Sequence, residues 1–291
     1  LMHWQTSRFV IELSAPKVMG IVNVTPDSFS DGGAHASSDA ARAHCDRLLA
    51  DGADILDIGG ESTRPGAAQL PLEDELARVL PVVRHAVTLG VPVSVDTYKP
   101  AVMQAVLDLG ADIINDVWAL RWQAGGANST GMDVVRQHTS CGVCLMHMHR
   151  NPQTMQVAPM EGDVVPQVLL FLQHSAQYLR GLGVDIARIC IDPGIGFGKT
   201  VQQNFALLGQ QAALLPLGYP LLAGWSRKSS LAAVTGRSLA SVATLDVRDR
   251  LVPSVAAALL AVQNGAHVVR VHDVKETVQA LKVLGAMQQN S

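Results

Sequence analysis

Short apolar runs in this sequence end repeatedly in a polar or charged residue, and these residues could act together in one site. The residues that end such runs are Asn23, Asp57, Asp96, Asn115, Asp116, His147, Asp192, Lys228, Arg270 and His272. Among them, Asp96, Asn115 and Asp192 offer hydrogen-bond acceptors, and Lys228 adds a point donor. This combination suits a flat heterocycle with a guanidine-like edge, whose N–H groups need fixed acceptors.

A second set of residues is mostly cationic or hydroxyl-bearing and suits a pyrophosphate group. Its members are Asn23, Thr63, Arg64, Arg270 and His272. Arginine holds phosphate through paired N–H bonds, and the amide oxygen of Asn23 is a hard ligand of the kind that Mg²⁺ prefers. A single strand-end aspartate is often only a helix N-cap, but capping does not account for Lys228, Arg270 and His272 together.

The stretch DPGIGFGKT, residues 192–200, has the look of a phosphate-binding loop. The motif G-x-x-x-x-G-K-[ST] fails here because Pro193 stands where its first glycine must be, and proline has no N–H to offer a phosphate. The dinucleotide motif G-x-G-x-x-G fails because its third glycine falls on Lys199. We interpret the stretch as a buried strand that delivers Asp192 to a glycine-rich loop.

The eight apolar runs are separated by stretches long enough for a crossover helix, which predicts alternating strands and helices. Several helical segments end in DGAD, LGAD, LGVD or NGAH, where glycine can stop a helix before the next strand. Eight such units predict an α/β fold, a (β/α)8 TIM barrel, whose strands all end at one mouth. We expect HWQTSRFVIEL to form a short N-terminal β-hairpin and Pro81 to kink or interrupt its helix.

Length and composition agree with a single domain over residues 1–291. The net charge of −3 and the lack of a long basic run predict neither nucleic acid nor a membrane surface as a partner. No apolar stretch is long enough to span a bilayer and no signal peptide is evident, so we expect a cytoplasmic protein. Cys141 and Cys144 form a C-x-x-C without a second pair to complete a zinc site, which favours small buried thiols.

Eight sequence blocks follow one another in order between about residue 18 and residue 274. They read MGIVNVTPDSFSDGG, DIGGESTRPGA, VSVDTYKP, IINDV, LMHM, IDPGIGFGKT, AGWSRKS and VVRVHDV. This ordered set resembles the dihydropteroate synthase family, the pterin-binding TIM barrels of folate biosynthesis. One block alone would be weak evidence, whereas the ordered set is highly specific.

The resemblance implies a transferase that condenses (7,8-dihydropterin-6-yl)methyl diphosphate with 4-aminobenzoate, giving 7,8-dihydropteroate and pyrophosphate by a dissociative, SN1-like displacement. The implied ligands of the pterin diphosphate are Thr63, Asp96, Asn115, Asp192, Lys228, Arg270 and His272. Of these, the implied catalytic residues are Asp96, Asp192, Lys228, Arg270 and His272. The implied 4-aminobenzoate pocket consists of Phe29, Arg64, Pro65, Phe197 and Ser229. Asn23 is the implied ligand of the cofactor Mg²⁺, and the family also implies a homodimer and competition by sulfonamides for the aminobenzoate pocket.

Two segments depart from the family's pattern. His149 and Arg150 follow LMHM where many relatives have Gln-Gly, and a bulky segment places Trp118 and Trp122 near the expected mouth. We interpret His149 and both tryptophans as loop packing. Two other functions stay open: a methyltetrahydrofolate-binding corrinoid methyltransferase barrel, which would not need the SRKS and STRPG motifs, and a non-catalytic pterin-binding homologue, which arises when an enzyme copy loses its loops.

Overall fold

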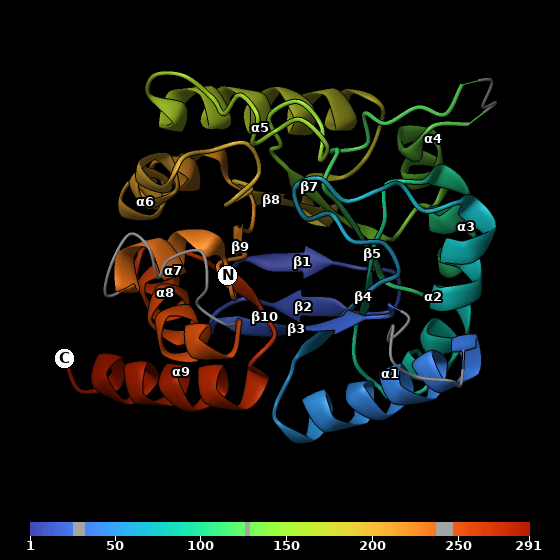
Figure 1. The fold of residues 1–291 in the computed structure, drawn as a ribbon, viewed down its shortest axis with the longest axis horizontal. Coiled ribbons are helices and arrows are strands. Elements are labelled where there is room, and N and C mark those ends of the chain that lie inside the picture. Colours follow the sequence, from blue (N-terminus) through green and yellow to red (C-terminus); the bar gives the residue numbers. More distant parts are fainter. Residues whose placement is uncertain (26–32, 126–128, 237–246) are drawn as a thin grey trace.

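The computed structural model describes residues 1–25, 33–125, 129–236 and 247–291 (Figure 1). Within them, eight parallel strands form one sheet in the order β8-β7-β6-β5-β4-β3-β10-β9. A parallel bridge between Ile191 of β8 and Leu221, beside β9, joins the two ends of the sheet. The strands are β3 (Lys17–Asn23), β4 (Ile55–Gly59), β5 (Val93–Asp96), β6 (Ile113–Asp116), β7 (Gly142–Met146), β8 (Ile189–Asp192), β9 (Leu222–Ala223) and β10 (Val268–Val271). The predicted TIM barrel is confirmed.

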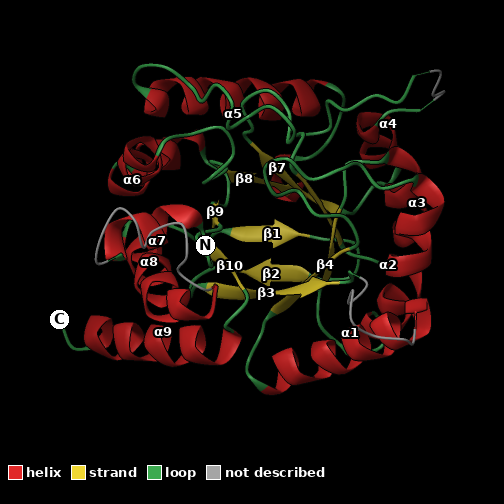
Figure 2. Ribbon diagram, viewed as in Figure 1, coloured by secondary structure: helices red, strands yellow, loops and turns green. Residues whose placement is uncertain are grey.

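Helices follow the strands along the chain and cover the outside of the barrel (Figures 1 and 2). They are α1 (Gly33–Ala50), α2 (Leu72–Ala86), α3 (Pro100–Asp108), α4 (Gly131–Gln137), α5 (Val164–Gly181), α6 (Val201–Gly209), α7 (Ser229–Thr235), α8 (Leu251–Gln263) and α9 (Val274–Gln289). Short 3₁₀ helices are η1 (Ile186–Arg188), η2 (Gln211–Leu217) and η4 (Val247–Arg250). No helix in the described part of the chain is long and apolar enough to cross a membrane.

Of the two expected effects of Pro81, the interruption of α2 was wrong, because the helix continues through this residue, and the kink stays a prediction. Proline inside a helix removes one backbone hydrogen bond. The buried Val79, Val82 and Val83 lie on both sides of Pro81 and belong to the main hydrophobic core. Tertiary packing of this face therefore outweighs the local cost of the proline.

The four repeated glycine signals mark the helix ends as predicted. Gly52, Gly110, Gly183 and Gly265 have left-handed φ angles of 103°, 101°, 94° and 100°. Residues with a Cβ rarely adopt this conformation, so glycine here lets the chain leave its helix and turn into the next strand.

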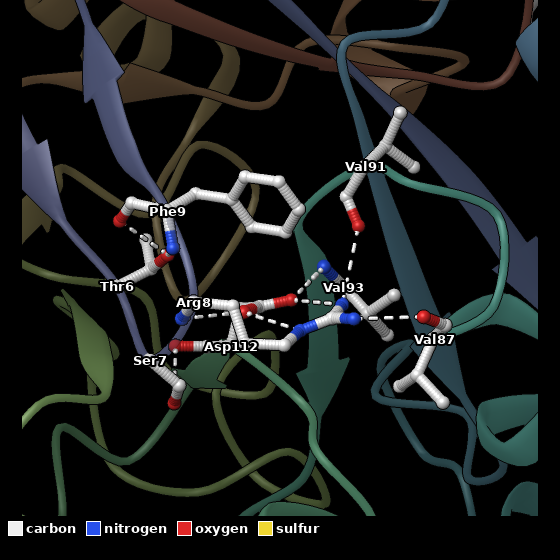
Figure 3. Close-up of polar contacts among 8 residues, drawn as sticks. All are labelled: Thr6, Ser7, Arg8, Phe9, Val87, Val91, Val93 and Asp112. Atoms are coloured by element: carbon white, nitrogen blue, oxygen red, sulfur yellow. Dashed lines mark hydrogen bonds and ion pairs between the residues drawn. The ribbon is translucent and has the colours of Figure 1, made fainter.

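The predicted N-terminal hairpin, β1 (His3–Gln5) and β2 (Val10–Glu12), lies against the amino ends of the barrel strands. Trp4 Nε1 donates to the backbone oxygen of Arg188, just before β8, at 3.0 Å. Arg8 binds Asp112, just before β6, through Nε at 3.1 Å and Nη2 at 2.8 Å, and the Val93 N–H donates to Asp112 at 2.8 Å (Figure 3). The hairpin therefore closes the amino end of the barrel, opposite the predicted mouth.

Candidate active site

Side chains from four barrel strands meet around Arg270 of β10. Its Nε donates to Oδ2 of Asp57 in β4 at 2.6 Å, and its Nη2 donates to Oδ2 of Asp96 at the end of β5 at 3.1 Å. The side-chain amide of Asn115 in β6 donates to the same Asp57 oxygen at 3.2 Å. The structure thus brings together three predicted site residues, and Asp57 connects two of them.

Asp57 is a residue that the sequence analysis noted without giving it a role. It is 0% exposed, and its Oδ1 has no hydrogen-bond partner among the described residues. The strand-end pattern was its only signal, because its partner Arg270 is 213 positions away in sequence. Its geometry makes it a support that orients Arg270 and Asn115.

Burial and pairing set the charges of this cluster. Burial raises the pKa of Asp96 to about 7, although Arg270 opposes the shift. Burial alone would lower the pKa of Arg270, but Asp57 and Asp96 outweigh it and raise the pKa above its ordinary value. Arg270 therefore stays a cation, while the ionisation of Asp96 changes near neutral pH.

Asp192 ends β8 and is buried beside the same cations. Its Oδ1 accepts the N–H of Gly194 at 2.8 Å. Burial raises the pKa of Asp192, and Gly194, Lys228 and Arg270 act in the opposite direction. Because Lys228 and Arg270 both act on the pKa of Asp192, they lie within electrostatic reach of its carboxylate, as expected for residues that share one mouth.

The glycine-rich loop after Asp192 is shaped for close packing. Its left-handed glycines are Gly194, Gly196 and Gly198. A Cβ on Gly194 would lie 1.8 Å from the backbone oxygen of His147. The buried Lys199 donates through Nζ to the backbone oxygens of Gly194 at 2.7 Å and Phe197 at 3.2 Å. The lysine thus holds the loop from inside, which agrees with the failure of the nucleotide motifs.

Lys228 lies just before α7, over the ring of Phe197. Its Nζ is 4.6 Å from the ring centroid, in a cation–π contact. Burial lowers the pKa of Lys228 to about 8, Arg270 adds to this effect, and Asp192 opposes it. The predicted residues Lys228 and Phe197 are therefore in contact, whereas Ser229, the first residue of α7, is exposed.

His272 follows β10 and is bound to Ser226 of the β9–α7 connection. The Ser226 hydroxyl lies 2.8 Å from Nδ1 of His272, and the His272 N–H donates to the same hydroxyl at 3.0 Å. Burial lowers the pKa of His272 to about 3, with a further effect of Arg227 and Arg270. The ring is thus neutral near pH 7. In the tautomer that carries its N–H on Nε2, Nδ1 accepts the serine hydroxyl and Nε2 can donate to an anion.

Thr63, Arg64 and Pro65 lie in the connection between β4 and α2. Thr63 is partly exposed, and Arg64 and Pro65 are exposed. The charge of Arg64 contributes to the lowered pKa values of Lys228 and His272. Arg64 therefore adds positive charge at the rim of the same mouth.

Asn23 and Phe29 belong to the connection after β3. Asn23 ends the strand with an exposed side chain, and Phe29 lies outside the described residues. No group of three or more His, Cys, Asp or Glu residues in the described ranges could hold a metal by itself. Mg²⁺ often takes only one or two protein oxygens and completes its shell with water and substrate phosphates. Asn23 fits an ion that is bound in this way with a diphosphate.

Known proteins are similar to this chain in sequence over nearly its whole length. A family model described as pterin binding enzyme matches residues 19–272. The chain is 46% identical over 289 residues to dihydropteroate synthase of Neisseria meningitidis serogroup B, covering 98% of this chain and 97% of the relative. The chain belongs to the pterin-binding enzymes, among the dihydropteroate synthases.

Two solved dihydropteroate synthases are similar to this chain in structure as well. The enzyme from Burkholderia cenocepacia, complexed with 7,8-dihydropteroate, is 49% identical with a TM-score of 0.86, covering 99% of this chain and 97% of that one. The enzyme from Xanthomonas albilineans with 4-aminobenzoic acid is 49% identical with a TM-score of 0.85, covering 96% and 95% of the two chains.

The two tryptophans of the rim are packed against other side chains, as predicted. Trp118 and Trp122 pack against a cluster formed by Tyr98, Val117, Met146, Met148, Met155 and Phe197. Asp116 shapes the first of these segments, since its two carboxylate oxygens each accept one backbone N–H, from Trp118 and Leu120, at 2.8 Å. Arg150 stands where the family's glycine is expected and has a left-handed φ of 60°.

The remaining candidates of the sequence analysis are buried. Cys141 and Cys144 are both 0% exposed, as expected for structural thiols. Arg188 Nη2 donates to Cys141 Sγ at 3.3 Å, and Cys144 is paired in register with Cys190 of β8. His147 is buried, and its Nδ1 has no hydrogen-bond partner in the described part of the chain.

Proposed function

We propose that this chain condenses (7,8-dihydropterin-6-yl)methyl diphosphate with 4-aminobenzoate to form 7,8-dihydropteroate and pyrophosphate. The observation that carries the proposal is the meeting of Arg270, Asp96 and Asn115 at one end of the barrel, with Asp192 and Lys228 within electrostatic reach. The family, and the ligands bound by its solved members, support the same reaction.

In this proposal the buried acceptors recognise the pterin. Asp96 and Asp192 accept the N–H groups of the guanidine-like edge, and Asn115 presents its amide oxygen because its nitrogen is engaged by Asp57. Lys228 donates to the ring acceptors. Water is largely excluded from these groups by burial, which strengthens each hydrogen bond to charge.

The cationic and hydroxyl residues take the leaving group. Arg270 donates N–H bonds to the diphosphate, the neutral His272 donates through Nε2, and Thr63 contacts the diphosphate from the loop. Asn23 would hold Mg²⁺ together with the diphosphate, and the ion supplies charge neutralisation there. The residues of this set therefore lower the free energy of the departing pyrophosphate.

The reaction then proceeds by dissociation followed by capture. The bond between the pterin methylene carbon and the diphosphate oxygen breaks, and its electron pair leaves with pyrophosphate. The positive charge left on the methylene spreads into the electron-rich ring, and the carboxylates of Asp96 and Asp192 favour it. The amine nitrogen of 4-aminobenzoate attacks the methylene and loses one proton. Phe29, Arg64, Pro65, Phe197 and Ser229 form the proposed pocket for this second substrate.

We further propose that residues 1–291 act as one domain in a cytoplasmic homodimer that joins through α8 and α9. A groove between these helices is lined by Leu259, Gln263, Ala280, Val283, Leu284 and Met287. Val283 is 72% exposed and Met287 is 54% exposed, which leaves apolar surface for a second copy. Four free cysteines agree with a reducing compartment. Light scattering tests the dimer, and a monomer at micromolar concentration would refute it.

One assay tests the proposed reaction against the two other functions. Pyrophosphate release should require both the pterin diphosphate and 4-aminobenzoate. A corrinoid methyltransferase would instead transfer a methyl group without releasing pyrophosphate, and a non-catalytic homologue would bind the pterin without turnover. Pyrophosphate release that is independent of 4-aminobenzoate would also contradict the proposal.

A further inference from the structure

A buried ion cluster lies at the base of the β4–α2 connection, outside the groups used in the mechanism above. Lys99 Nζ lies 2.7 Å from Glu61 Oε2 and 2.6 Å from Glu75 Oε1. The three side chains are only 9%, 8% and 1% exposed, respectively. Two carboxylates that share one buried ammonium are costly unless other bonds satisfy their remaining lone pairs.

The Glu75 half of the cluster fixes Lys99 independently of the loop. Glu75 lies in the first turn of α2, and its Oε2 accepts the Thr97 hydroxyl at 2.5 Å. Burial raises the pKa of Glu75, while Lys99 and Thr97 lower it. Lys99 is thus held between α2 and the start of α3 and gives Glu61 a fixed partner.

The Glu61 half closes the loop on itself. The Oε1 of Glu61 accepts the backbone N–H of Leu70 at 2.8 Å and the hydroxyl of Tyr98 at 2.9 Å. Glu61 and Leu70 bracket residues 62–69, so one carboxylate ties the beginning of the loop to its end. The same carboxylate ties both ends to the β5–α3 connection, which starts directly after Asp96.

The tip of this loop is attached much more weakly. The Gly66 N–H donates to the backbone oxygen of Pro152 at 3.0 Å, and Gln153 Nε2 donates to the backbone oxygen of Ala67 at 3.2 Å. Gly66 and Gln153 are exposed, so water competes for these bonds. The loop therefore has a base fixed by buried charge and a tip that two surface contacts hold, as far as the described residues are concerned.

We propose that Glu61 is a positioning residue for the second substrate. It fixes the loop base relative to the pterin site, so that Arg64 and Pro65 reach the 4-aminobenzoate pocket in one geometry. Glu61 itself touches neither substrate and acts through the loop backbone. This inference rests on the proposed function, because the pocket is defined by the second substrate of that reaction.

The Glu61→Gln variant of the full chain tests the proposal. It keeps the size of the side chain but removes the charge facing Lys99. In either orientation the NH₂ group of the new glutamine faces hydrogen-bond donors, which are Lys99 Nζ on one side and the Leu70 N–H and Tyr98 hydroxyl on the other. We expect the KM for 4-aminobenzoate to rise about tenfold or more, since small misplacements of positioning groups have effects of this size. The affinity for a pterin without its diphosphate should stay unchanged. Glu73→Gln, an exposed carboxylate in the first turn of α2, is the matched control and should behave as the parent.

The outcomes separate this proposal from the proposed function. If the parent releases no pyrophosphate, the proposed function is wrong. If the parent turns over and a folded Glu61→Gln variant keeps the parent KM for 4-aminobenzoate, the positioning role is wrong. Equal weakening of pterin and 4-aminobenzoate binding would also overturn it, because that result means general damage to the mouth.

Hydrogen exchange in the unmutated protein tests the same idea without relying on a variant that folds. The Leu70 amide, bound to Glu61, should exchange far more slowly than the Gly66 amide at the tip. Addition of 4-aminobenzoate with pyrophosphate and Mg²⁺ should slow the Gly66 amide and leave Leu70 nearly unchanged. Similar exchange of both amides in the free protein would refute a rigid base.

Discussion

The Asp57→Asn substitution tests how far Arg270 depends on the carboxylate that orients it. Arg270 Nε and the Asn115 amide both donate to one Asp57 oxygen, at 2.6 and 3.2 Å. The amide keeps the shape and one acceptor oxygen but removes the charge. The perturbation therefore acts on the strength and direction of these two hydrogen bonds and on the Oδ1 position.

The size of the effect follows from these contacts. A hydrogen bond to a charged group contributes about 1.5–3 kcal/mol and a neutral one about 0.5–1.5 kcal/mol, so the change removes about 1–1.5 kcal/mol. The new amide nitrogen replaces Oδ1, which has no partner in the described part of the chain, and adds an unsatisfied buried donor. That donor lowers the stability of the folded protein, whereas the loss of about 1–1.5 kcal/mol in orienting Arg270 corresponds to a factor of about 5 to 13 in rate.

We therefore expect kcat/KM for the pterin diphosphate to fall about 5- to 13-fold, measured by pyrophosphate release at saturating 4-aminobenzoate. The control is Asp51→Asn, an exposed aspartate after α1, which should leave kcat/KM unchanged. Circular dichroism and Tm show whether the variant is folded. A folded Asp57→Asn enzyme within about twofold of the parent kcat/KM would refute the orienting role.

Four further predictions follow from the site and its rim. Asp192→Asn places an amide donor against a ring N–H of the pterin, at a cost of about 2–4 kcal/mol. The affinity for the pterin, measured by calorimetry, should therefore weaken at least about tenfold. An unchanged Kd would mean that Asp192 is not part of the site. Burial raises the pKa of Asp96 to about 7, and its carboxylate is ionised only above that value. The kcat/KM for the pterin diphosphate should thus fall from about pH 8 to about pH 6, and persistence of the same pH profile in Asp96→Asn would exclude Asp96 as its source. Arg150→Gly should relieve the left-handed φ of 60° and add about 1 kcal/mol to the free energy of unfolding; a lower Tm would contradict this. 4-Aminobenzoate should bind by calorimetry only with pyrophosphate and Mg²⁺, because closing Arg64 towards Arg270 and Lys228 opposes like charges unless an anion lies between them; equal affinity without pyrophosphate would mean a preformed pocket.

The strand ends were predictable because each buried strand is a local apolar run with a polar end. Asp96 and Asp192 are the last residues of β5 and β8, where the pattern placed them. The helix-ending glycines were predictable as well, because glycine is the residue that most readily adopts a left-handed φ. The predicted interruption at Pro81 was wrong because long-range packing of α2 outweighs the local effect of the proline.

The supporting contacts of the site could not be predicted in the same way. The role of Asp57 depends on barrel closure, which places β4 and β10 on either side of β3 and allows Arg270 to reach across. The closure of the 62–69 loop depends on Glu61 meeting Lys99, 38 positions later. Neither contact has a periodicity or a motif, so both need the three-dimensional arrangement.

The buried carboxylates at the two ends of the barrel differ in how many of their oxygens are hydrogen-bonded. At the amino end, Asp112 accepts from the backbone and the guanidinium of Arg8 and from the backbone N–H of Val93, so both its oxygens are engaged. At the carboxyl end, Asp57 leaves one oxygen without a partner among the described residues, and burial raises the pKa values of Asp96 and Asp192. A saturated carboxylate stabilises a fold but has no capacity left for a ligand. The unsaturated carboxylates destabilise the free protein and gain most from a cationic, N–H-rich partner. Ligand binding and catalysis are therefore expected at the carboxyl end of the barrel, while the hairpin stabilises the amino end.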